Sequence, residues 1–291
     1  MRRRILAAIV SLLPLALSAQ GTLHIWKGTS CRKDVTMTCF LPEGEPKASV
    51  IICPGGSYYW RDKTGEGPVA ARWLASEGYA AYVLNYRVAG VGDFVTGYRA
   101  VFRGNRHPDM ICDLQRALQL IREGSDAPVG VMGFSAGGHL VLSSGAFYGT
   151  NFLSRYGISP EVSLRPDFIA AIYPVVTMSD ANTVHRRSRR GLMGRSRVGN
   201  TVLRDSLSIE KHVSGALPPV FLLNCEDDPV VDGLNSAVLD SALTAEKVPH
   251  LYVRYLTGGH GFGADPDKMN EETSSWKTTF LQWLETVLKC D

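Results

Sequence analysis

Short runs of consecutive apolar residues recur along the chain and are bounded by Gly, Pro and charged residues. Such runs are typical of strands that are buried on both faces of a sheet. They predict strands over residues 48–53, 79–86, 129–134, 168–176 and 219–225, and a further strand over residues 250–256. Nearer the N-terminus, residues 22–26 and 35–41 alternate polar with apolar positions, which predicts antiparallel edge strands.

Segments with a helical spacing of apolar residues lie between the predicted strands. The clearest is residues 108–123, whose apolar residues on one face are Ile111, Leu114, Leu118 and Ile121. Further helices are predicted over residues 68–77, 137–148, 234–246 and 271–288. Strands that alternate with helices predict an α/β fold, with helices on both faces of a mostly parallel sheet. We expect one such domain over residues 20–291, because no repeat or linker interrupts the pattern.

Two arginine-rich segments break this alternation. Residues 87–107 form an irregular stretch rich in Gly and Arg, and residues 177–216 form a longer basic insertion. We expect the longer insertion to lie over the functional site as a lid. Its arginine cluster at residues 186–197 has two interpretations, a binding site for acidic sugars such as uronic acids or the solvated outer face of the lid.

Residues 1–19 have the features of a secretory signal peptide in the expected order. Arg2, Arg3 and Arg4 precede an apolar stretch over residues 5–17, and small residues precede a predicted cleavage near Ala19. The apolar stretch is short for a bilayer span and is interrupted by proline. These features predict an exported protein, periplasmic or secreted, without a membrane anchor.

Composition and charge exclude some classes of partner. Of the 291 residues, 45% are hydrophobic and 20% are charged, which is typical of a folded globular protein. The formal charge of +3 equals the charge of the three leader arginines, so the rest of the chain is nearly neutral. Overall charge therefore gives no basis for binding nucleic acid or an anionic membrane. The oligomeric state stays open.

Six cysteines in an exported protein raise the question of disulfides. Cys53 and Cys225 fall in apolar strand-like runs and Cys112 falls in a helical pattern, so we expect these three to be small buried residues. Cys31 and Cys39 could close an N-terminal hairpin, and the sequence leaves that pairing open. No C-x-x-C pair or Cys/His cluster is present, so we predict no metal and no cofactor.

One serine has the setting of a nucleophile. Ser135 lies between Gly133 and Gly137 in a G-x-S-x-G pattern, after a predicted strand and before a predicted helix. A sharp turn there lifts the hydroxyl clear of the sheet, and side chains at the flanking positions would collide with the strand or the helix. The alternative is a glycine-rich turn with an inert serine.

A serine hydroxyl needs a base and a carboxylate that orients the base. His260 follows the strand at residues 250–256 in a loop of glycines, which can aim an imidazole inward. Asp228 follows the strand at residues 219–225 and is favoured by the proline after it, with Asp227 as the alternative. The order Ser135, Asp228, His260 is that of α/β-hydrolases.

Backbone N–H groups must also stabilise the charge that develops on the substrate. Ala136 would supply one such group, and Gly56 or Ser57, in the loop after an early strand, would supply another. The aromatic residues after that loop could stack on a sugar ring or belong to the core. They are Tyr58, Tyr59 and Trp60.

Five motifs carry a family resemblance. They are P-G-G-S-Y at 54–58, N-Y-R at 85–87, G-F-S-A-G-G-H-L at 133–140, D-D-P-V-V at 227–231 and G-G-H-G-F-G at 258–263. On these residues the chain resembles α/β-hydrolases of the acetyl-esterase and acetylxylan-esterase-like type, related to the hormone-sensitive-lipase and dienelactone-hydrolase branches. The resemblance covers roughly residues 35–288.

The resemblance implies a serine carboxylesterase without a cofactor that works through an acyl-enzyme. It implies Ser135, Asp228 and His260 as the catalytic triad, and short acyl groups, acetyl in particular, carried by carbohydrate as the substrate. Members are commonly exported by bacteria that degrade plant polysaccharide. Two residues depart from the family pattern, which usually has glycine in place of Ser57 and proline in place of Asp232.

Two other functions remain open. One is a serine peptidase or aminoacyl hydrolase on the same fold, although the sequence shows no large substrate-selecting domain. The other is a non-catalytic binding protein that kept the fold, which the intact Ser, Asp and His motifs argue against.

Overall fold

The computed structural model of the protein describes residues 20–96 and 104–289. The predicted leader and its cleavage point lie outside these residues. Within the described residues, eight strands form one sheet in the order β1-β2-β4-β3-β5-β6-β7-β8. The strand bounds are β1 Gln20–His24, β2 Thr36–Phe40, β3 Ser49–Cys53, β4 Ala80–Leu84, β5 Val129–Phe134, β6 Ile169–Ile172, β7 Val220–Cys225 and β8 His250–Tyr255.

The sheet is parallel from β4 to β8, and β1 and β2 join its edge in antiparallel fashion. Every residue of β3, β5 and β7 is buried, which explains why these strands are continuous apolar runs in the sequence. The predicted mostly parallel sheet with antiparallel N-terminal edge strands is thereby confirmed.

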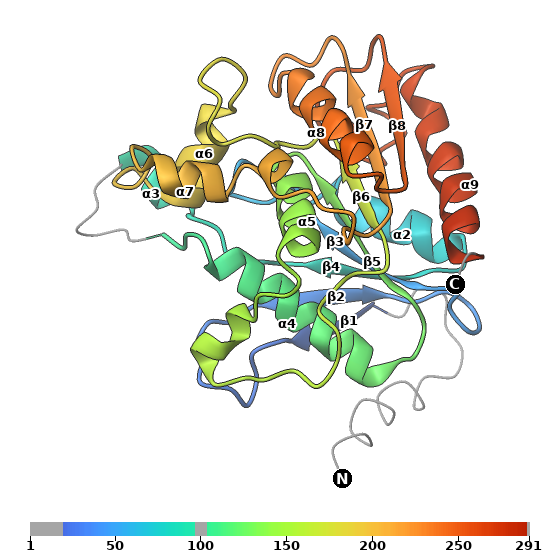
Figure 1. The fold of residues 1–291 in the computed structure, drawn as a ribbon. Helices are drawn as coiled ribbons and strands as arrows, with labels where there is room; N and C mark the ends of the chain where they lie inside the picture. Colours follow the sequence, from blue (N-terminus) through green and yellow to red (C-terminus); the bar gives the residue numbers. More distant parts are fainter. Residues whose placement is uncertain (1–19, 97–103, 290–291) are drawn as a thin grey trace.

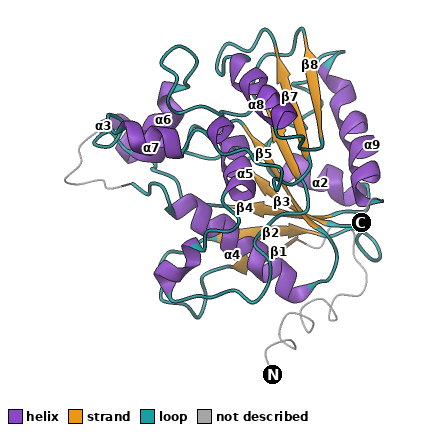
Figure 2. Ribbon diagram, in the orientation of Figure 1, coloured by secondary structure: helices purple, strands orange, loops and turns teal. Residues whose placement is uncertain are grey.

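Helices cover both faces of the sheet (Figures 1 and 2). One face packs against α4 (Asp109–Gly124), α5 (Ala136–Ala146) and α8 (Leu234–Ala245). The other face packs against α2 (Pro68–Ser76) and α9 (Trp276–Leu288). Side chains along β5 alternate between the two cores, as the strand period requires.

The strand predicted over residues 168–176 ends earlier, at Ile172. Tyr173 has a φ of 37°, and the chain turns there away from the sheet. The N–H of Val175 then donates to the carbonyl of Ser135 at 3.1 Å. The apolar residues after the turn are buried, as their pattern predicts. They pack beside the turn at Ser135 and do not extend β6.

The basic insertion contains two short helices, α6 (Arg186–Met193) and α7 (Thr201–Ser206). Together with α3 (Val91–Thr96) they form a group at one side of the sheet (Figure 1). Three single-turn 3-10 segments complete the described elements: η1 Phe152–Tyr156, η2 Ile209–Lys211 and η3 Thr273–Ser275.

The cysteine pairing that the sequence left open has an answer in the described residues. Cys31 and Cys39 are free and buried, so no disulfide closes the N-terminal hairpin. Among residues 20–96 and 104–289, no helix has the length and apolarity needed to cross a bilayer. Within the same residues, His, Cys, Asp and Glu form no group that could hold a metal ion.

Candidate active site

Ser135 lies at the turn between β5 and α5. Its φ of 54° and ψ of −119° lie outside the ordinary regions for an L-residue. A Cβ at Gly133 would overlap the backbone of Gly137, and a Cβ at Gly137 would overlap the carbonyl of Cys53. Both glycines are therefore required by close backbone approach, as the sequence pattern predicts.

Three side chains from three loops form a hydrogen-bonded chain at the carboxyl edge of the sheet. His260 Nε2 lies 2.9 Å from Ser135 Oγ, and His260 Nδ1 lies 2.6 Å from Asp228 Oδ2. The Asp228 side chain is 1% exposed and that of His260 is 11% exposed. A buried carboxylate that holds an imidazole against a hydroxyl can activate that hydroxyl for attack on a carbonyl.

The two adjacent aspartates have separate contacts. The second oxygen of Asp228 accepts the N–H groups of Val230 and Val231, which fixes the carboxylate toward His260. The carboxylate of Asp227 instead accepts the N–H groups of Gly258 at 3.2 Å and Gly259 at 2.8 Å. Asp228 thus contacts the imidazole, whereas Asp227 ties the histidine loop to the end of β7.

The loop after β3 lies directly against Ser135. A Cβ at Gly55 would come within 2.9 Å of Ser135 Cβ. Gly56 has a φ of 131° and Ser57 a φ of 56°, so the chain makes a tight left-handed turn here. Within the described residues, the N–H groups of Gly56 and Ser57 donate to no protein acceptor. Together with Ala136, the first residue of α5, these are the donors expected near a reacting oxygen.

A buried carboxylate links the glycine loop to the histidine loop. Glu66 accepts the Gly55 N–H at 2.7 Å and the Tyr173 hydroxyl at 2.9 Å. The same hydroxyl accepts the Gly263 N–H at 2.9 Å, and the Tyr173 ring lies 4.6 Å from the His260 ring. Burial raises the pKa of Glu66 above its ordinary value. The contacts of Glu66 thus reach both loops that flank Ser135.

Two of the three aromatic residues predicted to stack on sugar belong to the core. The rings of Tyr58 and Tyr59 are 0% and 1% exposed, so neither offers a face to a ligand. The Tyr58 hydroxyl bonds His139 Nδ1 at 2.7 Å, and burial lowers the pKa of His139 to about 4. His139 is thus a structural histidine, and Trp60 alone of the three aromatics is partly exposed.

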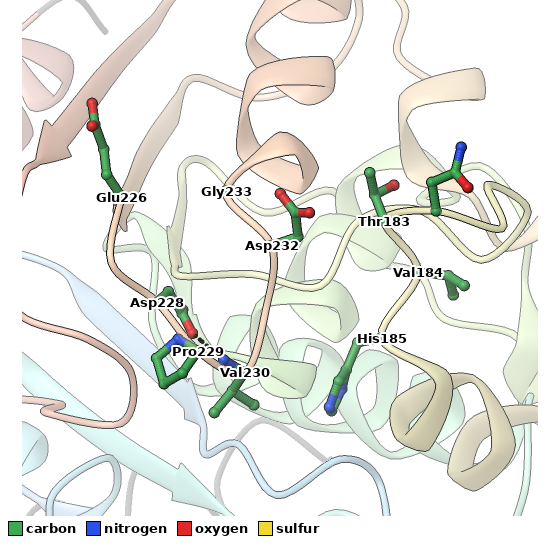
Figure 3. Close-up of a pocket in the computed structure, with 10 residues that line it drawn as sticks. Thr183, Val184, His185, Glu226, Asp228, Pro229, Val230, Asp232 and Gly233 are labelled. Atoms are coloured by element: carbon green, nitrogen blue, oxygen red, sulfur yellow. Dashed lines mark hydrogen bonds between the residues drawn. The ribbon is translucent and has the colours of Figure 1, made fainter.

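A pocket of about 470 Å³ opens beside Asp228, between residues 182–185 and residues 226–233. Figure 3 shows Asp228, Val230 and His185 around it. Burial, followed by the charge of Arg187, lowers the pKa of His185 to about 4, so its ring is neutral near pH 7. His185 Nδ1 lies 2.8 Å from the hydroxyl of Ser188. Of the three hydrogen-bonded side chains, only Asp228 lines this pocket.

Sequence reasoning did not single out Glu66 or His185. Glu66 lies in a polar segment and His185 precedes an arginine run, and neither belongs to a recognisable motif. Only tertiary packing brings the two residues to the carboxyl edge of the sheet.

Comparisons with known proteins show the family and the fold of the chain. A model of the BD-FAE family matches residues 37–243. An acetylxylan esterase of Xylanibacter ruminicola is 27% identical over 95% of the chain and 55% of its own length. The crystal structure of an acetyl ester-xyloside bifunctional hydrolase from Caldicellulosiruptor lactoaceticus superposes with a TM-score of 0.78 at 28% identity, over 95% of this chain and 98% of that one.

A dipeptidyl aminopeptidase BIII of Pseudoxanthomonas mexicana is 26% identical over 75% of the chain and 30% of its own length. The chain thus spans about half the length of one of these curated relatives and about a third of the other. The superposed hydrolase confirms the α/β-hydrolase fold that the motifs implied.

Proposed function

Because the chain belongs to the BD-FAE family of α/β-hydrolase esterases, we propose that it is a serine carboxylesterase that removes short acyl groups from plant carbohydrate. Acetyl is the acyl group we favour. The hydrogen-bonded chain Ser135–His260–Asp228 is the observation that carries the proposal. The similarity to an acetylxylan esterase and to an acetyl ester-xyloside bifunctional hydrolase supports the substrate class.

In the proposed mechanism, Ser135 Oγ attacks the ester carbonyl while His260 Nε2 takes the hydroxyl proton. Asp228 accepts the Nδ1–H of His260 and stabilises the imidazolium that forms. The N–H groups of Ala136 and of the Gly56–Ser57 turn bind the negatively charged oxygen of the tetrahedral intermediate. His260 then returns its proton to the departing sugar oxygen, which leaves an acyl-serine.

Deacylation repeats these steps with water. His260 Nε2 takes a proton from water, the hydroxide attacks the acyl carbonyl, and the same proton returns to Ser135 as the acid leaves. Every proton and electron pair in this sequence is supplied by the ester, water and the named side chains. The proposal therefore needs no metal or cofactor.

The decisive experiment compares the wild-type protein with Ser135→Ala. We expect the wild type to hydrolyse p-nitrophenyl acetate and acetylated xylo-oligosaccharides, and we expect the variant to lose both activities by at least about a thousandfold. Labelling by a fluorophosphonate should occur in the wild type alone. Equal turnover by the two proteins would refute the proposal, and absence of labelling would favour a non-catalytic binding protein.

A peptidase is the second candidate, favoured by the similarity to a dipeptidyl aminopeptidase. The two functions can be distinguished by the leaving group of the preferred substrate, which is a sugar hydroxyl for an esterase and an amine for a peptidase. An amine is the poorer leaving group. We expect kcat/KM for an acetylated oligosaccharide to exceed that for a dipeptidyl amide. The reverse order would establish the peptidase.

We further propose that the protein is exported and that residues 1–19 are removed as a signal peptide. The sequence of these residues supports this proposal. N-terminal sequencing of the protein purified from its own cells should give a mature chain that begins near Gln20. A protein that retains Met1 would contradict export by this leader.

A further inference from the structure

Helix α6 of the basic insertion packs directly on the turn that carries the proposed oxyanion donors. A Cβ at Gly191 would overlap the carbonyl oxygen of Ser57 and would approach Tyr58 Cβ to 3.0 Å. The residues one turn earlier on the same face of α6 therefore lie close to this turn. Arg187, four residues before Gly191, is one of them.

Within the described residues, the arginines of this insertion have no carboxylate partner. Its arginines are Arg186, Arg187, Arg189, Arg190, Arg195, Arg197 and Arg204. In the described part of the chain, none of these forms an ion pair. Where their guanidinium groups donate hydrogen bonds, the acceptors are backbone carbonyls.

Arginines elsewhere in the structure show the contrast. Arg87 bonds the buried carboxylate of Asp113 at 2.8 Å, and Arg106 bonds Asp93 at 2.9 Å. On α6, burial lowers the pKa of Arg189, and the charges of Arg204 and Arg186 lower it further. Like charges that crowd one another without a carboxylate attract an anion from solution.

Among these arginines, Arg187 lies against two aromatic rings next to the turn of the proposed oxyanion donors. Its guanidinium carbon lies 6.0 Å from the ring centroids of both Trp60 and Phe94, and these two rings meet edge to face at 5.3 Å. The backbone N–H of Trp60 donates to the Gly56 carbonyl at 3.1 Å, so the backbone that carries this ring is tied to the turn of the proposed oxyanion donors. Arg187 itself is exposed.

A guanidinium held against aromatic rings keeps in-plane N–H groups for a carboxylate, which it binds in bidentate fashion. The partly exposed ring of Trp60 can pack against a pyranose ring at the same time. A carboxylate next to a sugar ring is the chemistry of a uronic acid. The unpaired arginines around Arg187 would attract a glycan that contains uronic acids over a longer range.

We propose that Arg187 and Trp60 form a binding site for a uronic acid residue of the substrate, so that the preferred esters are carried by acidic glycans. This inference rests on the proposed esterase function and specifies the substrate of the same site. It also decides between the two interpretations of the arginine cluster in favour of a ligand site.

The experiment uses an acetylated oligosaccharide that bears a uronic acid and the same compound after reduction of its carboxyl to an alcohol. For the wild type we expect kcat/KM to be about tenfold higher on the acidic compound, chiefly through KM, as for one charge-assisted contact at a partly exposed site. Arg187→Gln should abolish this ratio, and added salt should reduce it.

Arg165→Gln is the matched control. Its guanidinium carbon lies 5.9 Å from the Tyr148 ring. The residue precedes β6, at the amino ends of the parallel strands, whereas the site lies at their carboxyl ends. This variant should keep the full preference for the acidic compound. A ratio near one in the wild type, or a ratio that survives in Arg187→Gln, would overturn the inference.

A second measurement separates this inference from the proposed function. Calorimetry with an unacetylated uronic oligosaccharide and its carboxyl-reduced form needs no catalysis. Tighter binding of the acidic form by the wild type, lost in Arg187→Gln, would support the site even if no ester is hydrolysed. Equal binding of both forms would reject the site while leaving esterase activity intact. Binding to anionic vesicles but not to the acidic oligosaccharide would also reject it.

Discussion

The carboxylate of Glu66 lies 2.7 Å from the backbone nitrogen of Gly55, at the point where the glycine loop passes Ser135. Its other oxygen accepts the hydroxyl of Tyr173, which in turn accepts the N–H of Gly263. Glu66 therefore holds the loop of the proposed oxyanion donors and the loop of His260 in one hydrogen-bonded assembly. It touches neither Ser135 Oγ nor His260 Nε2 in this assembly, so we regard it as a positioning residue.

Glu66→Gln should lower kcat for p-nitrophenyl acetate about tenfold, or about 1.4 kcal/mol of activation free energy, with little change in KM. The amide keeps one acceptor but cannot accept from both Gly55 and Tyr173. A purely structural role would instead change thermal stability without changing kcat of the folded enzyme. Tyr173→Phe, which leaves the Glu66–Gly55 contact in place, should cause a smaller loss.

The adjacent aspartates should differ sharply in their effect on turnover. Asp228→Asn should lower kcat by about a thousandfold or more, because an amide no longer stabilises the imidazolium or the reactive tautomer of His260. Asp227→Asn removes only part of the support of Gly258 and Gly259 and should cost less than about tenfold. Steady-state kinetics on a chromogenic acetate would decide the assignment, and equal losses would contradict it.

Ser57 has a left-handed backbone conformation that costs an L-residue about 1 kcal/mol. Ser57→Gly should therefore raise the free energy of unfolding by up to about 1 kcal/mol, less the extra chain entropy of glycine. Ser57→Val should lower it, because a β-branched residue tolerates this conformation poorly. Urea unfolding of the three proteins measures both changes, and a less stable glycine variant would show that the Ser57 side chain contributes contacts of its own.

His139 should make the protein sensitive to acid. Its pKa is about 4 in the folded protein against 6.5 in an unfolded chain, because burial disfavours the charged ring. The unfolded state thus binds a proton first, and stability that is complete above pH 6.5 is lost progressively as the pH falls toward 4. Between these pH values, the proton uptake of His139 lowers the free energy of unfolding by about 3 kcal/mol.

In His139→Gln, the decrease in unfolding free energy between pH 7 and pH 4 should be smaller by about this amount. Tyr58→Phe provides the comparison, since it removes a hydrogen bond of His139 but keeps the ring. That variant should be less stable at every pH and should retain the steep acid dependence. An unchanged pH dependence in His139→Gln would assign the acid sensitivity to other groups.

The sequence predicts the sheet and the serine turn because their determinants are local. Continuous apolar runs specify buried strands, and the strand–turn–helix pattern around Ser135 can be recognised within a few residues, although Gly137 is required by a contact with the distant Cys53 carbonyl. The partners of the serine lie 93 or more positions away, and their places after predicted strands, their order along the chain and the family resemblance all indicated them. The chain's membership in the BD-FAE family confirms that resemblance.

Other features depend on tertiary structure. The proline after Asp228 favoured it over Asp227, but the directions of the two carboxylates are set by the loop that they enter. Tyr58 and Tyr59 follow a loop in the sequence and look accessible, but α6 from the distant insertion covers them. Glu66 acquires its partners only because three chain segments converge on it.

The contact between Gly191 and Ser57 leaves no space for even one methyl group, so we expect a shift of α6 to move the turn of the proposed oxyanion donors. A displacement of α6 that admitted a larger substrate would carry these N–H groups away from the reacting oxygen. In the proposed mechanism, substrate range and turnover are therefore linked through the position of one helix.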